Sequence, residues 1–105
     1  MNPPQESDWK KFRAGLDQWR ERYLAARIPR LIATLQAEGK SPTERFWDAE
    51  QQIAEEARTL RRCFDDIARS KMTIRLWDMR RAGIITRADL ADFSAAAQDA
   101  VFGER

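Results

Sequence analysis

The stretch GKSPTERFWDAEQQ, residues 39–52, separates two long helical segments and decides how they meet. Gly39 is typical of the residue just after a helix, where the backbone turns left-handed. Ser41 and Glu44 form a capping-box pattern around Pro42, which suits the first position of a new helix. Because so few residues separate the two segments, we expect them to be antiparallel neighbours in a helical hairpin.

The segment before this turn, residues 8–38, is predicted to be the first helical arm. Its apolar residues recur at intervals of three and four, which is typical of an amphipathic helix. They are Trp9, Phe12, Leu16, Trp19, Tyr23, Leu24, Ile28, Leu31, Ile32 and Leu35. Ser7 is the expected N-cap, with Asp8 in the first turn. Pro29 predicts a kink or a short break, because proline removes one helical hydrogen bond. Residues 1–6 are predicted to be a flexible tail.

The segment after the turn, residues 42–82, is predicted to be the second arm. Between Thr43 and Ala82 it contains neither glycine nor proline. Its apolar stripe consists of Phe46, Ile53, Ala57, Leu60, Phe64, Ile67, Ala68, Met72, Leu76 and Met79. A single helix over this arm would be roughly 60 Å long. A break near residues 70–73 is the alternative, since serine and threonine are weaker helix formers. The sequence leaves both open.

The last segment is predicted to be a short helix over residues 87–101. Gly83 ends the second arm, and Thr86 with Asp89 repeats the capping-box pattern. The apolar face of this helix would carry Leu90, Phe93, Ala97 and Val101. We expect it to fold back over the open end of the hairpin, near Trp9, Met72 and Trp77.

The register of the hairpin follows from folding the chain about residue 40. The apolar pairs brought together are Leu35 with Phe46, Tyr23 with Ala57, Trp19 with Leu60, Leu16 with Phe64 and Phe12 with Ala68. The predicted fold is therefore all-α: a long antiparallel helical hairpin plus a short C-terminal helix, in one domain over residues 1–105.

A lone hairpin of this kind buries little apolar surface. The chain contains four tryptophans and five phenylalanines, and each large aromatic covers about 150–250 Å² when buried. A second copy of the chain would supply the missing helices. We therefore expect a homodimer that closes as a helical bundle with two-fold symmetry.

The residue types argue against an enzyme. The chain has no histidine, which is the commonest general base and metal ligand in proteins. Cys63 is the only cysteine and has no base to activate it. Asp65 and Asp66 are expected to form ion pairs with Arg61 and Arg62, four residues earlier, on a solvated helix face. We expect no catalytic residue, no metal and no cofactor.

The composition also bears on location. The apolar runs are too short for a membrane-spanning helix, and the polar start is unlike a secretory signal. A single cysteine fits a reducing compartment, so we expect a cytoplasmic protein. Fifteen arginines against four lysines, with many alanines, suggest a bacterial source with GC-rich DNA.

Residues 69–87 are the most basic part of the chain. They carry one acid, Asp78, and six cations: Arg69, Lys71, Arg75, Arg80, Arg81 and Arg87. These cations are candidates for binding nucleic-acid phosphates. The competing interpretation, which we favour, is that the acidic last helix folds back and neutralises them. The acids that would do so are Asp89, Asp92 and Asp99.

The aromatic and methionine side chains give candidates for contact with a partner. Trp47 follows Phe46, and adjacent helical residues point about 100° apart, so both cannot face the first arm. The candidate contact residues are Trp47, Met72, Trp77 and Met79. The favoured hypothesis is a non-enzymatic protein-protein interaction module, such as a bacterial regulator, adaptor or assembly factor. The alternative is a nucleic-acid-binding regulator that uses the basic segment.

Overall fold

The computed structural model describes residues 4–103, and within that part of the chain every regular element is helical. The α-helices are α1 (Glu6–Leu35), α2 (Pro42–Phe64), α3 (Met72–Arg81) and α4 (Ala95–Phe102), with 3₁₀ turns at Arg69–Lys71 and Arg87–Leu90. The all-α class is confirmed. Residues 1–3 of the predicted tail lie outside the described residues, and Glu6 already belongs to α1.

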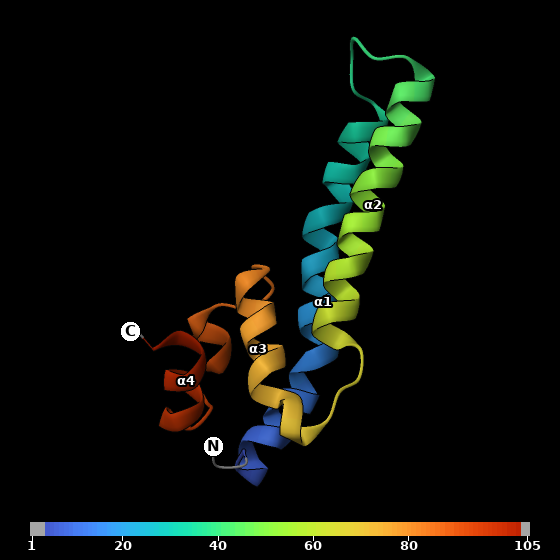
Figure 1. The fold of residues 1–105 in the computed structure, drawn as a ribbon. Helices are drawn as coiled ribbons and strands as arrows, with labels where there is room; N and C mark the ends of the chain where they lie inside the picture. Colours follow the sequence, from blue (N-terminus) through green and yellow to red (C-terminus); the bar gives the residue numbers. More distant parts are fainter. Residues whose placement is uncertain (1–3, 104–105) are drawn as a thin grey trace.

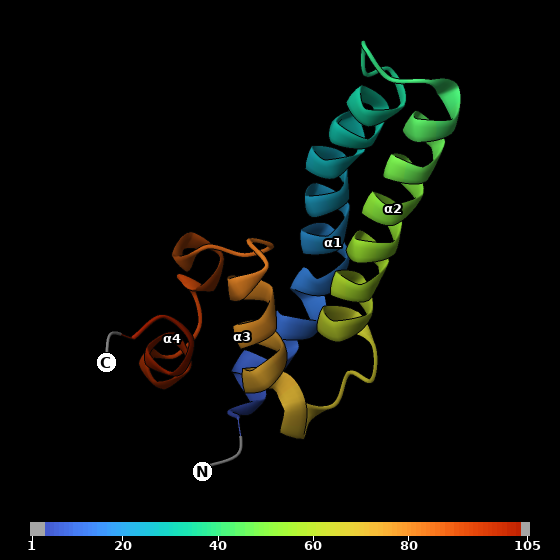
Figure 2. The same cartoon turned by 45° about the horizontal axis from the view of Figure 1, so that its top comes forward.

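The two long helices, α1 and α2, lie side by side in both views of the ribbon (Figures 1 and 2). The Thr34 hydroxyl donates to the Gln52 side-chain oxygen at 2.6 Å, close to the turn. Farther down, Arg27 pairs with Glu56 at 3.7 Å. The predicted capping box opens α2: Ser41 Oγ accepts from the Glu44 N–H, and the Glu44 carboxylate accepts from the Ser41 N–H.

The start and the middle of α1 differ from the prediction. The helix begins at Glu6, so Ser7 is inside it and is not the N-cap. The helix also runs without a break through Pro29. Both Pro29 and Ala25, whose carbonyl loses its usual partner, are exposed. Water can therefore satisfy that carbonyl, which removes much of the cost of an internal proline.

The second arm is not one helix. It ends at Phe64, and Asp66 takes a left-handed backbone conformation (φ 56°) that no α-helix continues through. The break therefore comes earlier than residues 70–73. Arg75 donates to the Asp65 carbonyl at 3.2 Å, and the Lys71 ammonium pairs with the Asp66 carboxylate.

Two contacts expected from the sequence are absent because α2 ends at Phe64. Asp65 and Asp66 lie beyond the last turn of α2, so neither forms the expected pair with Arg61 or Arg62 among the ion pairs of the described residues. Ala68 lies in the connecting segment between α2 and α3, so it cannot pair with Phe12 as part of the second arm.

The predicted last helix, residues 87–101, is divided in two. The Thr86–Asp89 pattern does form, with the Thr86 N–H donating to the Asp89 carboxylate at 2.8 Å, but it opens only a 3₁₀ turn. Ser94 then caps α4 as a separate helix. The expected apolar face is still buried, because the 3₁₀ turn and α4 both pack inward.

The hydrophobic core lies at the end of the molecule where α3 and α4 pack (Figure 2). Its large, fully buried side chains come from α1, α2, α3 and the C-terminal segment and are Phe12, Cys63, Met72, Leu76, Met79, Leu90 and Val101. The distal parts of α1 and α2, near the turn at residues 36–41, extend beyond this core (Figure 1).

Asp8, near the start of α1, is hydrogen-bonded to Ser94 at the start of α4. It is 2% exposed and is the one buried charged residue in the described part of the chain. Its carboxylate accepts from the Ser94 N–H at 2.8 Å and from the Ser94 hydroxyl at 2.6 Å. The carboxylate that was expected only to complement the α1 dipole therefore also fixes the start of α4.

Replacing Asp8 with alanine is expected to lower the free energy of unfolding by about 2–3 kcal/mol, because two charge-assisted hydrogen bonds are lost and their partly buried Ser94 donors are left unpaired. Urea unfolding followed by circular dichroism measures the loss. Asp17→Ala is the matched control, since Asp17 is exposed on the same helix and should change stability by less than about 0.5 kcal/mol. Equal effects of the two variants would refute the structural role of Asp8.

Candidate functional site

The four predicted contact residues separate into two pairs. Trp47 is 59% exposed and Trp77 is 41% exposed. Met72 and Met79 are fully buried in the core, so neither is available to a partner. The spacing of the two methionines is the same for a core stripe and for an exposed one, which is why the sequence did not separate them.

The two tryptophans also differ in what holds them. Trp77 donates through its indole N–H to the Ala100 carbonyl at 3.2 Å, and Arg80 lies over its ring at 5.6 Å. Trp77 therefore helps to fix α4 to α3. Trp47 contacts the ring of its neighbour Phe46 edge-on, with centroids 4.9 Å apart. The Phe46–Trp47 pair lies at the start of α2, far from the core.

Together with other exposed side chains on the distal parts of α1 and α2, this pair belongs to a set that we call the exposed apolar group. Its members are each about half exposed and are Ile28, Ile32, Leu35, Phe46, Trp47 and Ile53. On α3, Ile74 is similarly exposed but lies apart from them in the chain. Large apolar side chains that gather on one part of a surface mark an interaction site more often than single exposed ones do.

The predicted register makes Leu35 and Phe46 a facing apolar pair between the two arms. In the structure Leu35 is 49% and Phe46 57% exposed, so neither is buried between α1 and α2. The residues of α2 that do face α1 are small or polar, with Ala49 buried and Gln52 and Glu56 in interhelical contacts. These contact residues do recur at intervals of three and four, as a helix face requires. Because two of them are polar, a search for apolar periodicity does not detect them.

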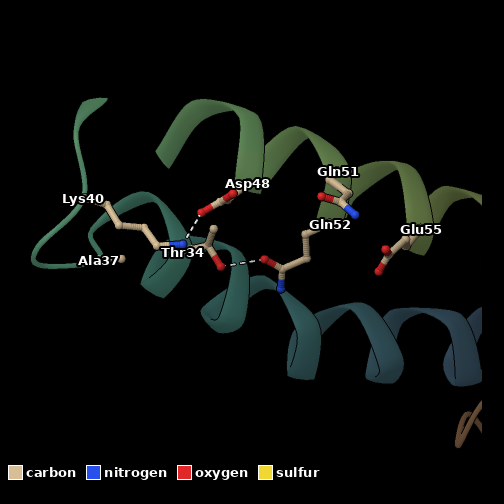
Figure 3. Close-up of a pocket in the computed structure, with 7 residues that line it drawn as sticks. All are labelled: Thr34, Ala37, Lys40, Asp48, Gln51, Gln52 and Glu55. Atoms are coloured by element: carbon tan, nitrogen blue, oxygen red, sulfur yellow. Dashed lines mark hydrogen bonds and ion pairs between the residues drawn. The ribbon is translucent and has the colours of Figure 1, made fainter. Parts of the chain in front are cut away.

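A polar pocket occupies another side of the same helix pair (Figure 3). It is lined by Thr34, Ala37, Lys40, Asp48, Gln51, Gln52 and Glu55. Lys40 pairs with Asp48 at 2.5 Å across its mouth, which raises the pKa of the Lys40 ammonium, chiefly through that hydrogen bond. An ammonium held in this way stays protonated and cannot act as a base.

The cations of the basic segment are largely engaged within the chain. Arg80 donates to the Val101 carbonyl and Arg87 to the Phe102 carbonyl, each at 2.7 Å. Both carbonyls are at the C-terminal end of α4, where the helix dipole is negative. Arg69 binds the Pro4 carbonyl and the Glu6 carboxylate.

Of the remaining cations, Lys71 pairs with Asp66, and Arg75 contacts the Asp65 carbonyl and Asp78. Arg81 has no ion pair or side-chain hydrogen bond among the described residues. Five of the six nucleic-acid candidates therefore have partners within the chain, and these partners differ from one cation to the next.

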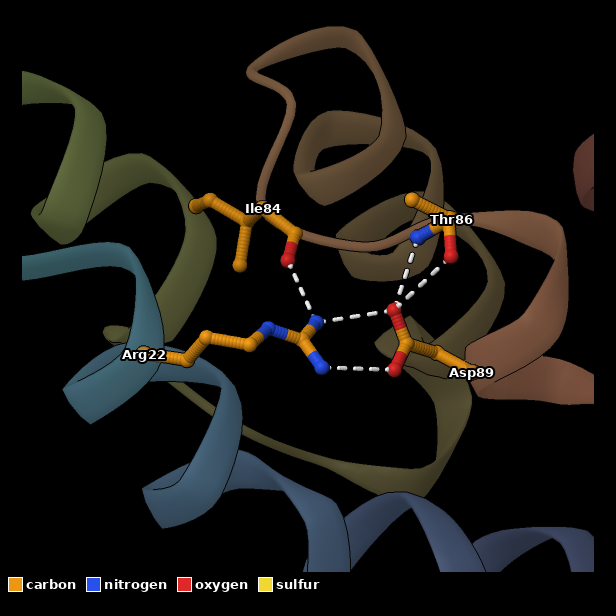
Figure 4. Close-up of polar contacts among 4 residues, drawn as sticks. All are labelled: Arg22, Ile84, Thr86 and Asp89. Carbon is orange, nitrogen blue, oxygen red and sulfur yellow. Dashed lines mark hydrogen bonds and ion pairs between the residues drawn. The ribbon is translucent and has the colours of Figure 1, made fainter. Parts of the chain in front are cut away.

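The expected neutralisation by Asp89, Asp92 and Asp99 does not take place through those side chains. Asp89 binds Arg22 of α1 instead, with two contacts of 2.8 and 2.9 Å (Figure 4). Arg22 also donates to the Ile84 carbonyl at 2.9 Å. Within the basic segment, Arg80 and Arg87 bind instead the carbonyls that end α4, and a charge count along the sequence does not include such carbonyls.

The Asp89 carboxylate has a shifted pKa because of its contacts with Arg22 and Thr86. Burial acts to raise its pKa, but hydrogen bonds from Arg22 and from the Thr86 N–H outweigh burial and hold the pKa below its usual range. The same pairing raises the pKa of Arg22, mainly through the hydrogen bond to Asp89. The pair joins α1 to the 3₁₀ turn before α4.

In the described part of the chain, the groups that could carry covalent or metal chemistry do not lie together in one site. The Cys63 thiol is fully buried, and burial together with Asp78 raises its pKa to about 11, so it is protonated at neutral pH. Burial and Glu56 raise the pKa of Tyr23 to about 12. Among residues 4–103, no three histidine, cysteine or acidic side chains are grouped so that they could hold a metal ion.

None of the helices in the described residues is long and apolar enough to cross a membrane. No protein-family model matches the chain, and no curated protein or solved structure shows significant similarity to it. The exposed apolar group on α1 and α2 is therefore the candidate site on physical grounds alone.

The Arg22–Asp89 pair predicts a specific dependence of stability on pH. Because the folded pKa of Asp89 is depressed, its stabilisation is present at neutral pH and is lost as the pH falls below about 4. Asp89→Asn should lower the free energy of unfolding by about 1–2 kcal/mol at pH 7 and by much less at pH 3. Urea unfolding at both values tests this, with Asp92→Asn as the exposed control. A deficit that stays constant with pH would contradict it.

Proposed function

We propose that this protein is a non-enzymatic helical module that acts by binding protein, and that α1 and α2 form an antiparallel hairpin with an apolar binding flank. The observation that carries the proposal is the exposure of about half of each of four large apolar side chains on the distal helices, Ile28, Leu35, Phe46 and Ile53. A chain of 105 residues can bury only a modest core, so each large apolar side chain left outside the core is a loss of stability. A set of such side chains on one surface is typical of a site that a partner covers.

The position of the flank on α1 follows from its contacts with α2. Arg27 and Thr34 make those contacts. Ile28 and Leu35 each come one residue later, and one residue turns the side chain by about 100° around the helix. The apolar residues of α1 therefore lie to one side of the contact line and not on it.

The same offset occurs on α2. Gln52 and Glu56 contact α1, and Ile53 and Ala57 each come one residue later. When two antiparallel helices are viewed along their axes, one chain turns clockwise and the other counterclockwise. A step of one residue from the contact line therefore turns the apolar residues of α1 and of α2 toward the same side of the helix pair. We call this side the apolar flank. Its exposed members are Ile28 and Leu35 of α1 with Phe46 and Ile53 of α2. Toward the core end it continues through Leu24, Leu60 and Phe64, which are partly buried and pack against the core. Ile32 and Trp47 are exposed as well, but their rotation around the helices places them outside this flank.

The chain's own small helices support this assignment because they pack elsewhere. Cys63 lies seven residues after Glu56, so it shares the contact face of α2 and not the flank. It is buried in one cluster with Met72 and Leu76 of α3. In both ribbon views α3 and α4 lie together beside the lower part of α1 and leave the distal helices uncovered (Figures 1 and 2).

A partner that matches such a flank is a second helical pair. Two hairpins that meet flank to flank make a four-helix bundle, in which apolar stripes of both pairs form a common core. A second copy of the chain offers an identical stripe, and a two-fold dimer is the commonest closed assembly. The proposed function therefore operates through a homodimer.

Ile28→Glu and Ile53→Glu should each convert a dimer near twice 12.3 kDa into a monomer, because each places a charge in the proposed bundle core. Light scattering on a sizing column measures the mass, and circular dichroism checks that the variants stay folded. Ile74→Glu is the matched control, since Ile74 is equally exposed but lies on α3.

A wild-type chain that is monomeric at micromolar concentration would overturn homodimerisation. A dimer that survives both flank substitutions would overturn the flank as the binding surface. Absorbance at 260 nm that copurifies with the protein at low salt and disappears at high salt would favour the basic segment of residues 69–87 as a nucleic-acid site.

A further inference from the structure

The charged residues at the outer edges of the flank favour one orientation of two copies over the other. On α1, Glu21 lies six residues before Arg27, which turns it about 120° away from the contact line with α2, compared with about 60° for Leu24. Glu21 is therefore at the outer edge of the flank, at its core end. Asp17 lies one turn earlier still. The Asp17 and Glu21 side chains form ion pairs with Arg20 at 2.9 and 3.7 Å, yet they stay 87% and 74% exposed. The edge of α1 thus carries two exposed acids against one arginine at this level.

The edge of α2 is basic at the same end of the molecule. Arg61 follows Leu60 and precedes Phe64 by three residues, which places it at the outer edge of the α2 stripe. Arg58 lies three residues before it. Both arginines are exposed, and within residues 4–103 neither takes part in an ion pair or a side-chain hydrogen bond.

The interhelical contacts give the level of these charges along the hairpin. Thr34 contacts Gln52, and Arg27 contacts Glu56, so the numbers of residues at one level add up to between 83 and 86. Glu21 is therefore level with positions 62–65 of α2. Arg61 lies within about one helical turn of that level.

We propose that the flank is covered by a second copy whose two-fold axis runs parallel to the hairpin, so that Glu21 of each copy faces Arg61 of the other. This inference rests on the proposed function and adds the orientation of the dimer. A two-fold axis in this direction keeps residues at the same level and places α1 of one copy on α2 of the other. The acidic edge of α1 then meets the basic edge of the partner's α2, twice by symmetry.

The other two-fold arrangement matches the charges poorly. An axis perpendicular to the helices would place α1 on α1 and α2 on α2 with their levels inverted. Glu21 would then face the distal flank of the partner's α1, where the flank positions are apolar. Arg61 would likewise face the distal apolar stretch of α2. Four charges would be placed against apolar surface, which is unfavourable.

The experiment is a charge exchange between copies. Glu21→Arg alone and Arg61→Glu alone should each raise the dimer dissociation constant by roughly tenfold at low salt, because two attractive pairs become repulsive. An equimolar mixture of the two variants should restore wild-type affinity, since both pairs in the heterodimer are again of opposite charge. Glu55→Arg is the matched control, because Glu55 lines the polar pocket on another side of the hairpin (Figure 3).

Sedimentation equilibrium at low and high salt gives the dissociation constants, and circular dichroism confirms that each variant is folded. Restoration in the mixture, with the single-variant defects reduced by salt, supports the orientation. Single variants that dimerise like the wild type, or a mixture that stays as weak as its components, overturn it. If Ile28→Glu is monomeric in the same series, the flank remains the interface and only the orientation fails. A monomeric wild-type chain overturns both.

Discussion

The narrow contact line between α1 and α2 is the constraint on which the rest of the structure depends. It is made of small and polar side chains, with Ala49 buried and Thr34 bonded to Gln52. A line of this kind sets the register of the two helices but buries little apolar surface. The apolar side chains are therefore displaced to either side of it. At one end they meet α3 and form the core, and along the distal flank they stay exposed.

Two aspartates then fix the C-terminal third of the chain to α1. Asp8 holds the start of α4 through Ser94, and Asp89 holds the 3₁₀ turn before it through Arg22. Each contact joins residues more than sixty positions apart. α4 has only eight residues, which is too few for a helix to be stable alone. Its position is thus decided by these long-range contacts and by its packing on α3.

The sequence predicted what local chemistry decides. The helical class and the start of α2 at Ser41 follow from periodicity and capping, and both are present. The break after Phe64 contains no glycine or proline and depends on Arg75 and Lys71 reaching back across space, so it has no local signature. The prediction of partner-contact residues was partly wrong for a similar reason. Met72 and Met79 have the same spacing as exposed interface residues, and only the packing of α3 shows that they belong to the core.

The burial of Cys63 has a practical consequence. Its side chain is closed between α2 and α3, and the thiolate that reacts with alkylating reagents is disfavoured because burial raises its pKa to about 11. The thiol can react at an appreciable rate only when these two helices separate. At fixed pH, the rate at which the Cys63 thiol of the native protein is alkylated therefore measures how often α2 and α3 separate.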